Sequence, residues 1–280
     1  MIQPPASFSD PEPAPQPEPI PTRQPVYVRM PSLPPTVTYV LIGVTVFAYL
    51  LQILSSVFLG DSSYGIDWVT LFGARISEAI YAGQLWRLIT PMFLHGSFAH
   101  IFFNMYALLS VGTLLERHFG HWRFLLLYFL GGFAGNVLSF LFTQGYSVGA
   151  STAVFGLIAA EAIFCYQNRE LFGSHAKQAI SNAVFIIVIN LFLGLAPSID
   201  TWGHIGGLLG GAMFAWFAGP KWMTIGMPPE LSLHDERESR EVVTGASLVL
   251  LIFGGLTVWA FITNAEINKY KKARQLRRAF

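Results

Sequence analysis

Seven long apolar blocks constrain the fold of this chain more than any other feature of its sequence. Each block is close to the ~20 residues that an α-helix needs to cross the hydrocarbon core of a bilayer. The apolar residues run continuously instead of alternating, so helices are the only plausible spanning elements. The blocks predict an all-α polytopic membrane protein with a six-helix core and one additional C-terminal transmembrane helix. They cover residues 37–59, 97–115, 123–143, 149–166, 179–196, 201–218 and 243–263.

The low charge of the chain supports the same class of protein. Charged residues make up 12% of the sequence and apolar residues 53%, whereas a soluble domain has roughly 25% charged residues. The formal net charge of +1 gives no sign of a nucleic-acid partner. The single cysteine, Cys165, excludes an intrachain disulfide. His95 and His100 are not part of an HExxH pattern, so neither a metal nor another cofactor is expected.

The two ends of the chain differ in composition from the core. Residues 1–36 contain twelve of the 17 prolines. Proline lacks the backbone donor and fixes φ, so we expect a disordered, partly polyproline-II cytoplasmic arm that enters no sheet or regular helix. A spacer is the simpler interpretation of this arm, and a partner that binds PxxP motifs is the alternative. The start of the chain lacks a basic region followed by an apolar core, so no signal peptide is expected. The other predicted units are a core at 37–219, a polar cytoplasmic loop at 220–242, the seventh helix at 243–263 and a basic tail at 264–280.

Basic residues between the blocks predict the orientation, because cytoplasmic loops carry an excess of Lys and Arg. With the N-terminus in the cytoplasm, only Arg75 and Arg87 among the loops of the six-helix core face outward. The six basic residues of the tail would also lie outside, against the rule, but block 243–263 carries no charge and is expected to cross. The compact loops favour a bacterial inner membrane, with a eukaryotic secretory membrane as the alternative. The predicted cytoplasmic basic residues are Arg23, Arg29, Arg117, Arg123, Arg169, Lys177, Lys221, Arg237 and Arg240.

Polar side chains inside apolar blocks are costly and mark functional sites. His100 and Asn104 lie four residues apart, so they share one helix face, where both can donate hydrogen bonds. Ser151 and His204 lie at similar depth near the extracytoplasmic ends of their blocks. Taken singly, each of these residues is more often a packing, capping or interhelical hydrogen-bonding group. Three blocks that bring polar groups to one level favour Ser151 and His204 as a nucleophile–base pair.

Small residues would let these helices approach one another closely. The pairs Gly206–Gly210 and Gly207–Gly211 repeat at four-residue spacing, and the block that carries Ser151 contains GASTA near its start. Such surfaces bring helix backbones into contact in membranes. We therefore expect the helix of Ser151 to pack directly against the helix of His204.

Several motifs together resemble the rhomboid family of intramembrane serine proteases. No single motif is specific, but their order and combination are. The strongest part of the match runs from residue 71 to 218. Its motifs are LFGA at 71–74, WR at 86–87, HGSFAHIFFN at 95–104, LER at 115–117, GAS at 149–151 and IDTWGHIGGLLGG at 199–211.

The resemblance implies roles for residues at these positions. Ser151 would be the nucleophile and His204 the general base, and the oxyanion hole would include His100 and Asn104. Trp86 and Arg87 would belong to a membrane-embedded first loop, and Glu116 to a structural network near the cytoplasmic end of the second helix. The substrates would be single-pass transmembrane proteins in the lipid bilayer, cleaved within or near the extracytoplasmic end of their membrane helix.

Two positions near Ser151 depart from the family pattern. Thr152 stands where the family usually has a second glycine, and a β-branched residue is allowed there once the helix has begun. Phe155 stands where tyrosine is frequent, and its ring can still stack on His204. Gly149 leaves room beside the serine. Neither change removes a catalytic group, so we expect an active serine endopeptidase.

Asp200 lies four residues before His204 and invites comparison with a catalytic triad. An aspartate just before an apolar block is typical of a helix N-cap. We therefore interpret Asp200 as the cap of block 201–218 and not as a third catalytic residue.

Two other functions fit the sequence less well. A catalytically silent rhomboid-fold protein that binds membrane clients would usually lack Ser151 or His204, and this chain has both. A small transporter with a polar path through His100, Asn104 and Glu161 predicts an inverted internal repeat, and the sequence shows none.

Overall fold

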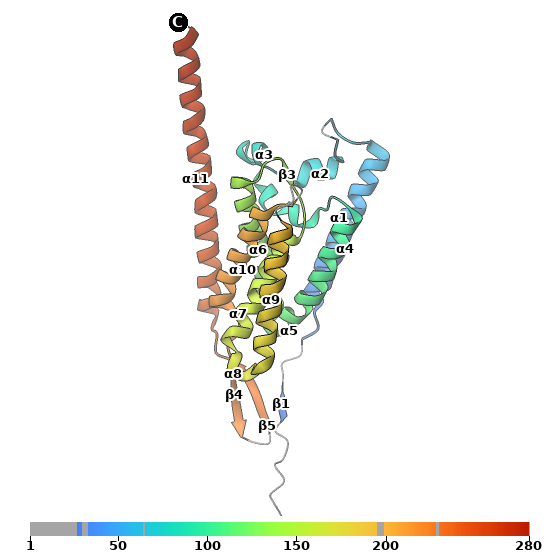
Figure 1. The fold of residues 1–280 in the computed structure, drawn as a ribbon, viewed down its shortest axis with the longest axis vertical. Helices are drawn as coiled ribbons and strands as arrows, with labels where there is room; N and C mark the ends of the chain where they lie inside the picture. The colour runs from blue at the N-terminus through green and yellow to red at the C-terminus, as the bar shows by residue number, and fades with distance from the viewer. Residues whose placement is uncertain (1–26, 30–32, 64, 195–198, 228–229, 280) are drawn as a thin grey trace, which may run out of the picture.

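The computed structural model describes residues 27–29, 33–63, 65–194, 199–227 and 230–279. Long helices stand side by side, and strand β1 (Tyr27–Arg29) lies at the opposite end from the C-terminus (Figure 1). Each of the seven predicted blocks forms a helix, apart from one or two described residues at the ends of some blocks, so the chain is the polytopic helical bundle that the sequence predicts. The predicted arm before residue 27 and the predicted end of the fifth block, at 195–196, lie outside the described residues. The helices are α1 (Thr36–Leu59), α4 to α5 (Phe98–Phe119), α6 (His121–Phe142), α7 (Ser151–Gln167), α9 (Ser174–Leu193), α10 (Thr201–Ala218) and α11 (Ser239–Ala279).

Five helices of the described chain are long and apolar enough to cross a membrane. They are α1, α4 to α5, α6, α9 and the part of α11 from Ser239 to Glu266. The other two predicted blocks, which form α7 and α10, are not among these five helices. Each has a physical reason. Helix α7 has only 17 residues, and α10 contains five glycines, which lower its hydropathy. Both pack mainly against other helices, and most of the α7 side chains are buried.

Glycines on two faces of α10 place it between α6 and α7. A Cβ atom added to Gly206 would lie 2.5 Å from the carbonyl oxygen of Ala134 in α6. A Cβ atom added to Gly211 would lie 2.2 Å from the carbonyl oxygen of Gly156 in α7. The three helices therefore meet backbone to backbone, as small-residue surfaces allow.

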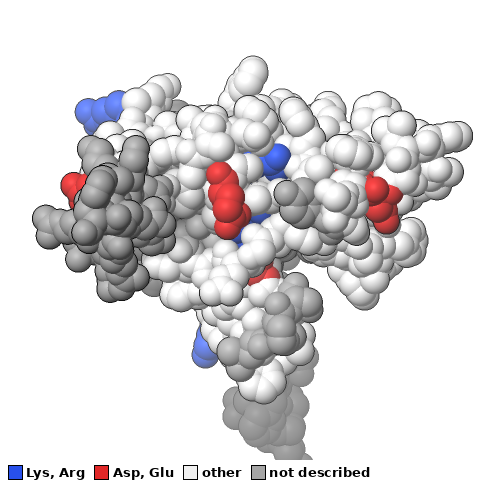
Figure 2. Space-filling model, turned by 90° about the horizontal axis from the view of Figure 1, so that it is seen from above, with Lys and Arg blue, Asp and Glu red and all other residues white. Residues whose placement is uncertain are grey.

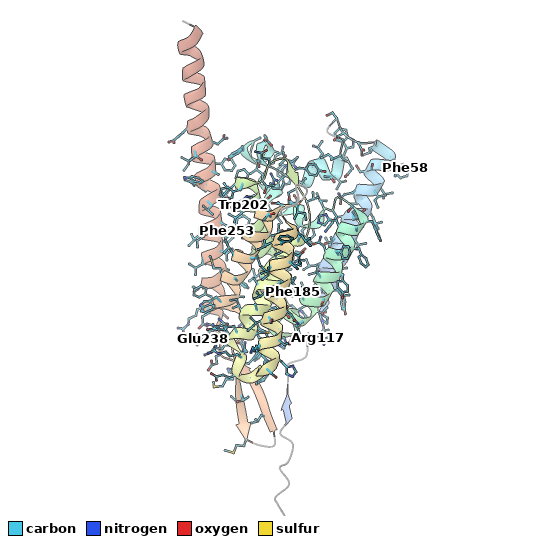
Figure 3. All side chains as sticks on the ribbon, in the orientation of Figure 1. Phe58, Arg117, Phe185, Trp202, Glu238 and Phe253 are labelled. Atoms are coloured by element: carbon cyan, nitrogen blue, oxygen red, sulfur yellow. The ribbon has the colours of Figure 1, made fainter. Side chains whose placement is uncertain are left out.

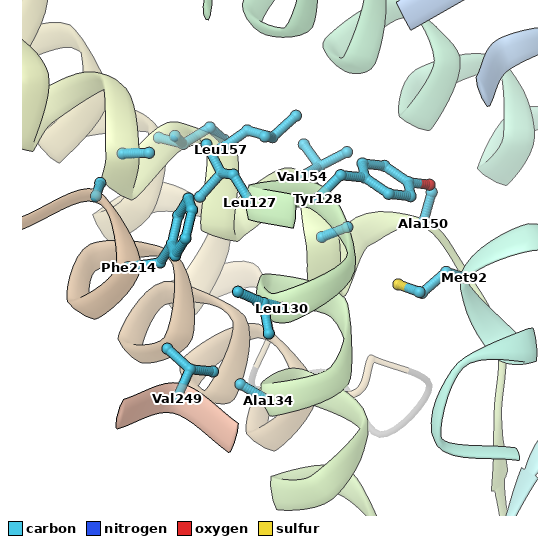
Figure 4. Close-up of a cluster of buried hydrophobic side chains, with 14 of the residues drawn as sticks. Met92, Leu127, Tyr128, Leu130, Ala134, Ala150, Val154, Leu157, Phe214 and Val249 are labelled. Atoms are coloured by element: carbon cyan, nitrogen blue, oxygen red, sulfur yellow. The ribbon is translucent and has the colours of Figure 1, made fainter. Parts of the chain in front are cut away.

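The larger side chains of the core surround this contact. Figure 4 shows Leu127 and Leu130 of α6 beside Phe214 of α10, with Val249 of α11 and Val154 of α7 nearby. All five are buried. The lateral surface is also apolar, because Phe185 and other large hydrophobic side chains are exposed along the helices. Arg117 and Glu238 lie at the end of the bundle near β4 and β5 (Figure 3). This distribution is typical of a bundle that faces lipid on its sides.

The segment between α1 and α4 folds into short elements that cover the other end of the bundle. Strand β2 pairs antiparallel with β3 (Tyr146–Ser147), with Arg75 opposite Ser147. Figure 2 looks onto this end, where the surface is mostly uncharged, with separate acidic and basic groups. The elements of the segment are α2 (Trp68–Gly73), β2 (Arg75–Ile76), α3 (Ser77–Tyr81) and the 3-10 turns η1 (Leu85–Leu88) and η2 (Thr90–Phe93).

The second predicted block is one helical column interrupted by a π turn. Helix α4 (Phe98–Ala107) continues through η3 (Leu108–Gly112) into α5 (Thr113–Phe119). Glu116 of α5 is fully buried and accepts hydrogen bonds from the backbone N–H groups of Val37 and Thr38, both at 2.7 Å. These amides open α1 and have no partner within that helix. The Glu116 carboxylate therefore caps α1 from another part of the chain.

A three-stranded sheet corrects two expectations about the predicted cytoplasmic end. Strands β4 (Trp222–Met227) and β5 (Glu230–Asp235) pair antiparallel, where a polar loop was predicted, and β1 pairs parallel with β5. The expectation that the arm enters no sheet is wrong for residues 27–29. These three residues contain no proline, so their N–H groups remain free to form a ladder. The short helix α8 (Arg169–Phe172) lies at the same end (Figure 1).

Helix α11 continues beyond the predicted seventh span. It runs the height of the bundle and extends past it (Figure 1), through the residues predicted as a separate basic tail. The tail sequence lacks glycine and proline and is rich in good helix formers, so no residue near position 263 ends the helix. Phe261 of α11 packs on Tyr81 of α3, with ring centroids 5.5 Å apart. The seventh helix thereby contacts the segment that precedes α4.

Candidate active site

Ser151 and His204 lie within hydrogen-bonding distance at the meeting point of α7 and α10. The Ser151 Oγ atom lies 3.0 Å from the His204 Nε2 atom. Ser151 is the first residue of α7, and Ala150 before it takes the N-cap position, without a side-chain capping bond. The Ser151 hydroxyl is therefore free to pair with the imidazole instead of capping the helix. Strand β3 ends four residues before Ser151, so the pair stands close to the end of the bundle that carries α2, α3 and β3 (Figure 1).

Phe155 forms a wall for the imidazole of His204. The two rings are stacked, with centroids 4.1 Å apart and planes 10° from parallel. Phe155 follows Ser151 by four residues, so both lie on the face of α7 that meets α10. The predicted stacking is present, and the ring holds the orientation of His204 without a hydroxyl group.

Gly149 lets His100 approach the nucleophile. Its φ of +136° is a conformation that residues with a Cβ atom rarely adopt. A Cβ atom at Gly149 would lie 2.8 Å from the His100 Nε2 atom and 3.5 Å from the Ser151 Oγ atom. The imidazole of His100 and the hydroxyl of Ser151 therefore both border the space over Gly149.

Asn104 lies one helical turn from His100 along α4. It is buried, and its amide Nδ2 donates to the carbonyl oxygen of His100 one turn earlier in α4, at 2.9 Å. This bond fixes the amide on the face of α4 that carries His100. The structure thus brings His100 to the serine, whereas Asn104 stands one turn away on the same helix.

His95 also lies at the site, where the sequence left open both a place at the mouth of the site and a surface role. It is 2% exposed, its ring lies 5.0 Å from that of His100, and its Nε2 atom accepts the backbone N–H of Ala150 at 3.3 Å. Burial, and then the neighbouring His100, lower the pKa of His95 to about 3. The ring is therefore neutral at neutral pH, which suits an acceptor. The sequence signals were its place two residues before the second block and at the start of the motif at 95–104.

Asp200 is the N-cap of α10, as predicted. Its Oδ1 atom accepts the backbone N–H of Gly203 at 2.9 Å. His204 Nδ1, the atom that a triad carboxylate would contact, is buried and has no hydrogen-bond partner among the described residues. The geometry is that of a Ser–His pair without a third member.

The remaining predicted site residues act at a distance from Ser151. Trp86 donates to the carbonyl oxygen of Phe72 at 3.1 Å and stacks on that ring. Buried Arg87 donates to the carbonyl oxygens of Leu71 and Ala74, at 2.8 and 2.7 Å, and so satisfies the end of α2. These contacts hold the first loop together.

Glu116, Gly207 and Gly211 contribute to the packing and capping of the helices. Glu116 caps α1, far along the bundle from Ser151. Gly207 and Gly211 lie where α10 touches the backbone of α7. Within the described residues, no three His, Cys, Asp or Glu side chains cluster in a way that could hold a metal ion.

Comparison with known proteins agrees with this architecture. The family model for the rhomboid domain matches residues 82–221, half of the chain. Rhomboid protease GluP of Bacillus subtilis (strain 168) is 40% identical over 178 residues, which are 63% of this chain and 34% of that protein. RHOMBOID-like protein 1 of Arabidopsis thaliana is 34% identical over 227 residues, 76% of this chain and 57% of that protein.

A third relative is covered over most of its length. Rhomboid-like protease 3 of Toxoplasma gondii is 33% identical over 198 residues, 66% of this chain and 73% of that protein. By contrast, the chain spans about a third of the Bacillus relative and little more than half of the Arabidopsis relative. The family match and the apolar helices make the chain an integral multi-pass membrane protein. The chain belongs to the rhomboid family.

Proposed function

We propose that the chain is an intramembrane serine endopeptidase in which Ser151 is the nucleophile and His204 the general base. The observation that carries the proposal is the 3.0 Å contact between the Ser151 Oγ and His204 Nε2 atoms. Two further features support it. Phe155 orients the imidazole, and the first turn of α7 offers backbone N–H groups that lack partners within the helix.

The reaction follows from this geometry. His204 takes the proton of Ser151 as the Oγ atom attacks the carbonyl carbon of the scissile bond. The tetrahedral intermediate collapses to an acyl-enzyme, and His204 gives the same proton to the leaving amine. Water then attacks the acyl group, again with His204 as base, and Ser151 recovers its proton. No cofactor takes part in these steps.

The oxyanion would be held by donors that converge near Gly149. The backbone N–H of Ser151 lies at the N-terminus of α7, where the helix dipole favours negative charge. The imidazole of His100 borders the same space. Asn104 would join them from the next turn of α4 once substrate is bound. One donor of this kind is worth about 10²- to 10³-fold in kcat.

The proposed substrates are single-pass transmembrane proteins. A protease site close to one end of the bundle reaches a membrane helix near its end, and the proposed orientation makes that end extracytoplasmic, with the N-terminus in the cytoplasm of a bacterial inner membrane. Backbone in a helix is hydrogen-bonded, so a substrate with Gly, Ser or Pro near the cut opens more easily. We therefore propose cleavage next to a helix-weakening segment.

The test is cleavage of a model transmembrane substrate in proteoliposomes. Ser151→Ala and His204→Ala are each expected to abolish detectable cleavage. The matched controls are Ser247→Ala on the exposed side of α11 and His175→Ala at the exposed start of α9, which should keep the wild-type rate. A fluorophosphonate probe should label the wild type and not Ser151→Ala. Cleavage by both site variants, or a wild type that neither cleaves nor reacts with the probe, would refute the proposal and favour a silent rhomboid-fold protein.

A further inference from the structure

The Asp200 carboxylate does more than cap α10. Besides the N–H of Gly203, it accepts hydrogen bonds from the hydroxyls of Thr143 at 2.7 Å and Ser147 at 2.6 Å, and from the hydroxyl of Ser139. Ser139 belongs to α6, Thr143 ends that helix, and Ser147 belongs to β3. Both carboxylate oxygens are occupied, and three segments of the chain meet on them.

These segments include the ones that carry the two proposed catalytic groups. Ser147 precedes Ser151 by four residues, through Gly149. Asp200 precedes His204 by four residues and accepts the first-turn amide of the same helix, while the N–H of His204 bonds to the carbonyl oxygen of Asp200 at 3.1 Å. One side chain therefore ties the segment of the nucleophile to the helix of the base.

We call the place where Ser139, Thr143 and Ser147 meet Asp200 the junction. Arg75, from the first loop, also binds there. It is fully buried, and its Nη1 atom donates to the carbonyl oxygens of Thr143 and Gly145, at 3.1 and 2.9 Å. It also stands opposite Ser147 in the β2–β3 pair. Burial lowers the pKa of Arg75, and the nearby Asp200 carboxylate opposes that effect. A buried cation thus lies near the carboxylate that joins the segments.

We infer that Asp200 is a positioning residue whose carboxylate sets the alignment of Ser151 and His204 without a hydrogen bond to either side chain. The inference rests on the proposed function. It differs from a triad, because a triad carboxylate accepts from the imidazole Nδ1 atom. Here His204 Nδ1 has no partner in the described part of the chain, and the Asp200 oxygens are engaged by Ser139, Thr143, Ser147 and Gly203.

Two substitutions at residue 200 separate these roles. Asp200→Ala removes every side-chain acceptor at residue 200, so the segments that meet there are held less firmly. A misplacement of the catalytic groups by about 1 Å can lower the reaction rate about 10²-fold. We expect kcat to fall by about 10- to 100-fold, with KM within about twofold of the wild type. Asp200→Asn keeps the planar shape, one acceptor oxygen and an NH₂ group that the rotatable hydroxyls can accept from. We expect it to retain kcat within about fivefold of the wild type.

A double-mutant cycle with Ser147 tests the junction itself. Ser147→Ala should lower kcat in the wild-type background and have no further effect in Asp200→Ala, because its partner is already gone. Ser247→Ala is the control that should be neutral in both backgrounds. The rate of fluorophosphonate labelling should follow kcat through the series. If Asp200→Ala does not fold, Asp200→Asn and Ser147→Ala still decide the question.

The outcomes distinguish the inference from the proposed function. A wild type that neither cleaves nor reacts with the probe refutes the proposed function. An active wild type with Asp200→Ala at full kcat, or with additive effects of the Asp200 and Ser147 substitutions, refutes the positioning role. An Asp200→Asn variant as slow as Asp200→Ala would show that the charge of residue 200, and not its hydrogen-bonded junction, sets the rate, and also overturns the inference.

Discussion

Replacing Gly207 by alanine would separate the two helices that carry the proposed catalytic pair. A Cβ atom on Gly207 would lie 2.0 Å from the carbonyl oxygen of Thr152 and 3.0 Å from its carbon. These are backbone atoms of α7, so no side-chain rotation can relieve the contact. Thr152 adjoins Ser151, and Gly207 follows His204 by less than one helical turn.

These distances determine how far α10 must move. Cβ contacts below 3.0 Å essentially never occur, so α10 must move away from α7 by about 1 Å. The contact between Ser151 Oγ and His204 Nε2, now 3.0 Å, would lengthen to about 4 Å, beyond a hydrogen bond. Misplacement by about 1 Å costs about 10²-fold in rate, or about 2.7 kcal/mol of transition-state stabilisation.

Helix propensity opposes this loss and provides the control. Alanine is better than glycine in a helix interior by about 1 kcal/mol, so Gly207→Ala should be harmless if packing did not matter. Gly254 in α11 has nothing within 4 Å of its added Cβ atom. Gly254→Ala should therefore keep the wild-type rate.

The assay is kcat for a transmembrane substrate in proteoliposomes, with the rate of fluorophosphonate labelling at Ser151 as a second measure. Far-UV circular dichroism and thermal unfolding in detergent establish that both variants are folded. Equal rates for folded Gly207→Ala and Gly254→Ala would show that the close approach of α7 and α10 does not set the alignment of the pair.

Three further predictions concern other contacts. Phe155→Ala should lower kcat by about threefold to tenfold, because an aromatic pair is worth about 0.5–1.5 kcal/mol, and Phe155→Tyr should retain activity. Glu116→Ala should lower the Tm in detergent, since each buried amide left unpaired at the start of α1 costs about 1–3 kcal/mol, while Glu116→Gln, which keeps one acceptor, should lower it less; equal losses would contradict the capping role. Because the pKa of His95 is lowered to about 3 from 6.5, its contribution to stability is complete above pH 6.5 and declines as the pH falls towards 3. His95→Gln, an acceptor that takes up no proton, should reduce the acid-dependent fall in Tm.

The helices and the proposed pair were predictable because each depends on a local pattern. Continuous apolar blocks located the seven helices. Ser151 and His204 stood out as polar groups at matching depth, and glycines at four-residue spacing predicted that their helices touch. The stacking of Phe155 on His204 was expected from the resemblance to the rhomboid family, which often has an aromatic ring at this position.

The contacts between distant segments were not predictable in the same way. The hydroxyls of Ser139 and Ser147 meet Asp200 only because of the rotation of α6 and the register of β3, which no local pattern determines. Strand β5 did carry a signal, since Leu231 and Leu233 alternate with polar residues, but the pattern is too short to distinguish a strand from a loop. Its pairing with β1 joins segments roughly two hundred residues apart.

The cap of α1 has a consequence for how the protein is made. The first amides of α1 are satisfied by Glu116, which follows Val37 by 79 positions. At about 5–20 residues per second, the ribosome completes α1 at Leu59 roughly 3 to 11 s before it adds Glu116. During that interval the first helix enters the bilayer with open polar groups at one end, held only by water or lipid headgroups. Once the second helix is in place, Glu116 accepts hydrogen bonds from these amides. The first two helices are therefore expected to reach their final structure together, as one hairpin.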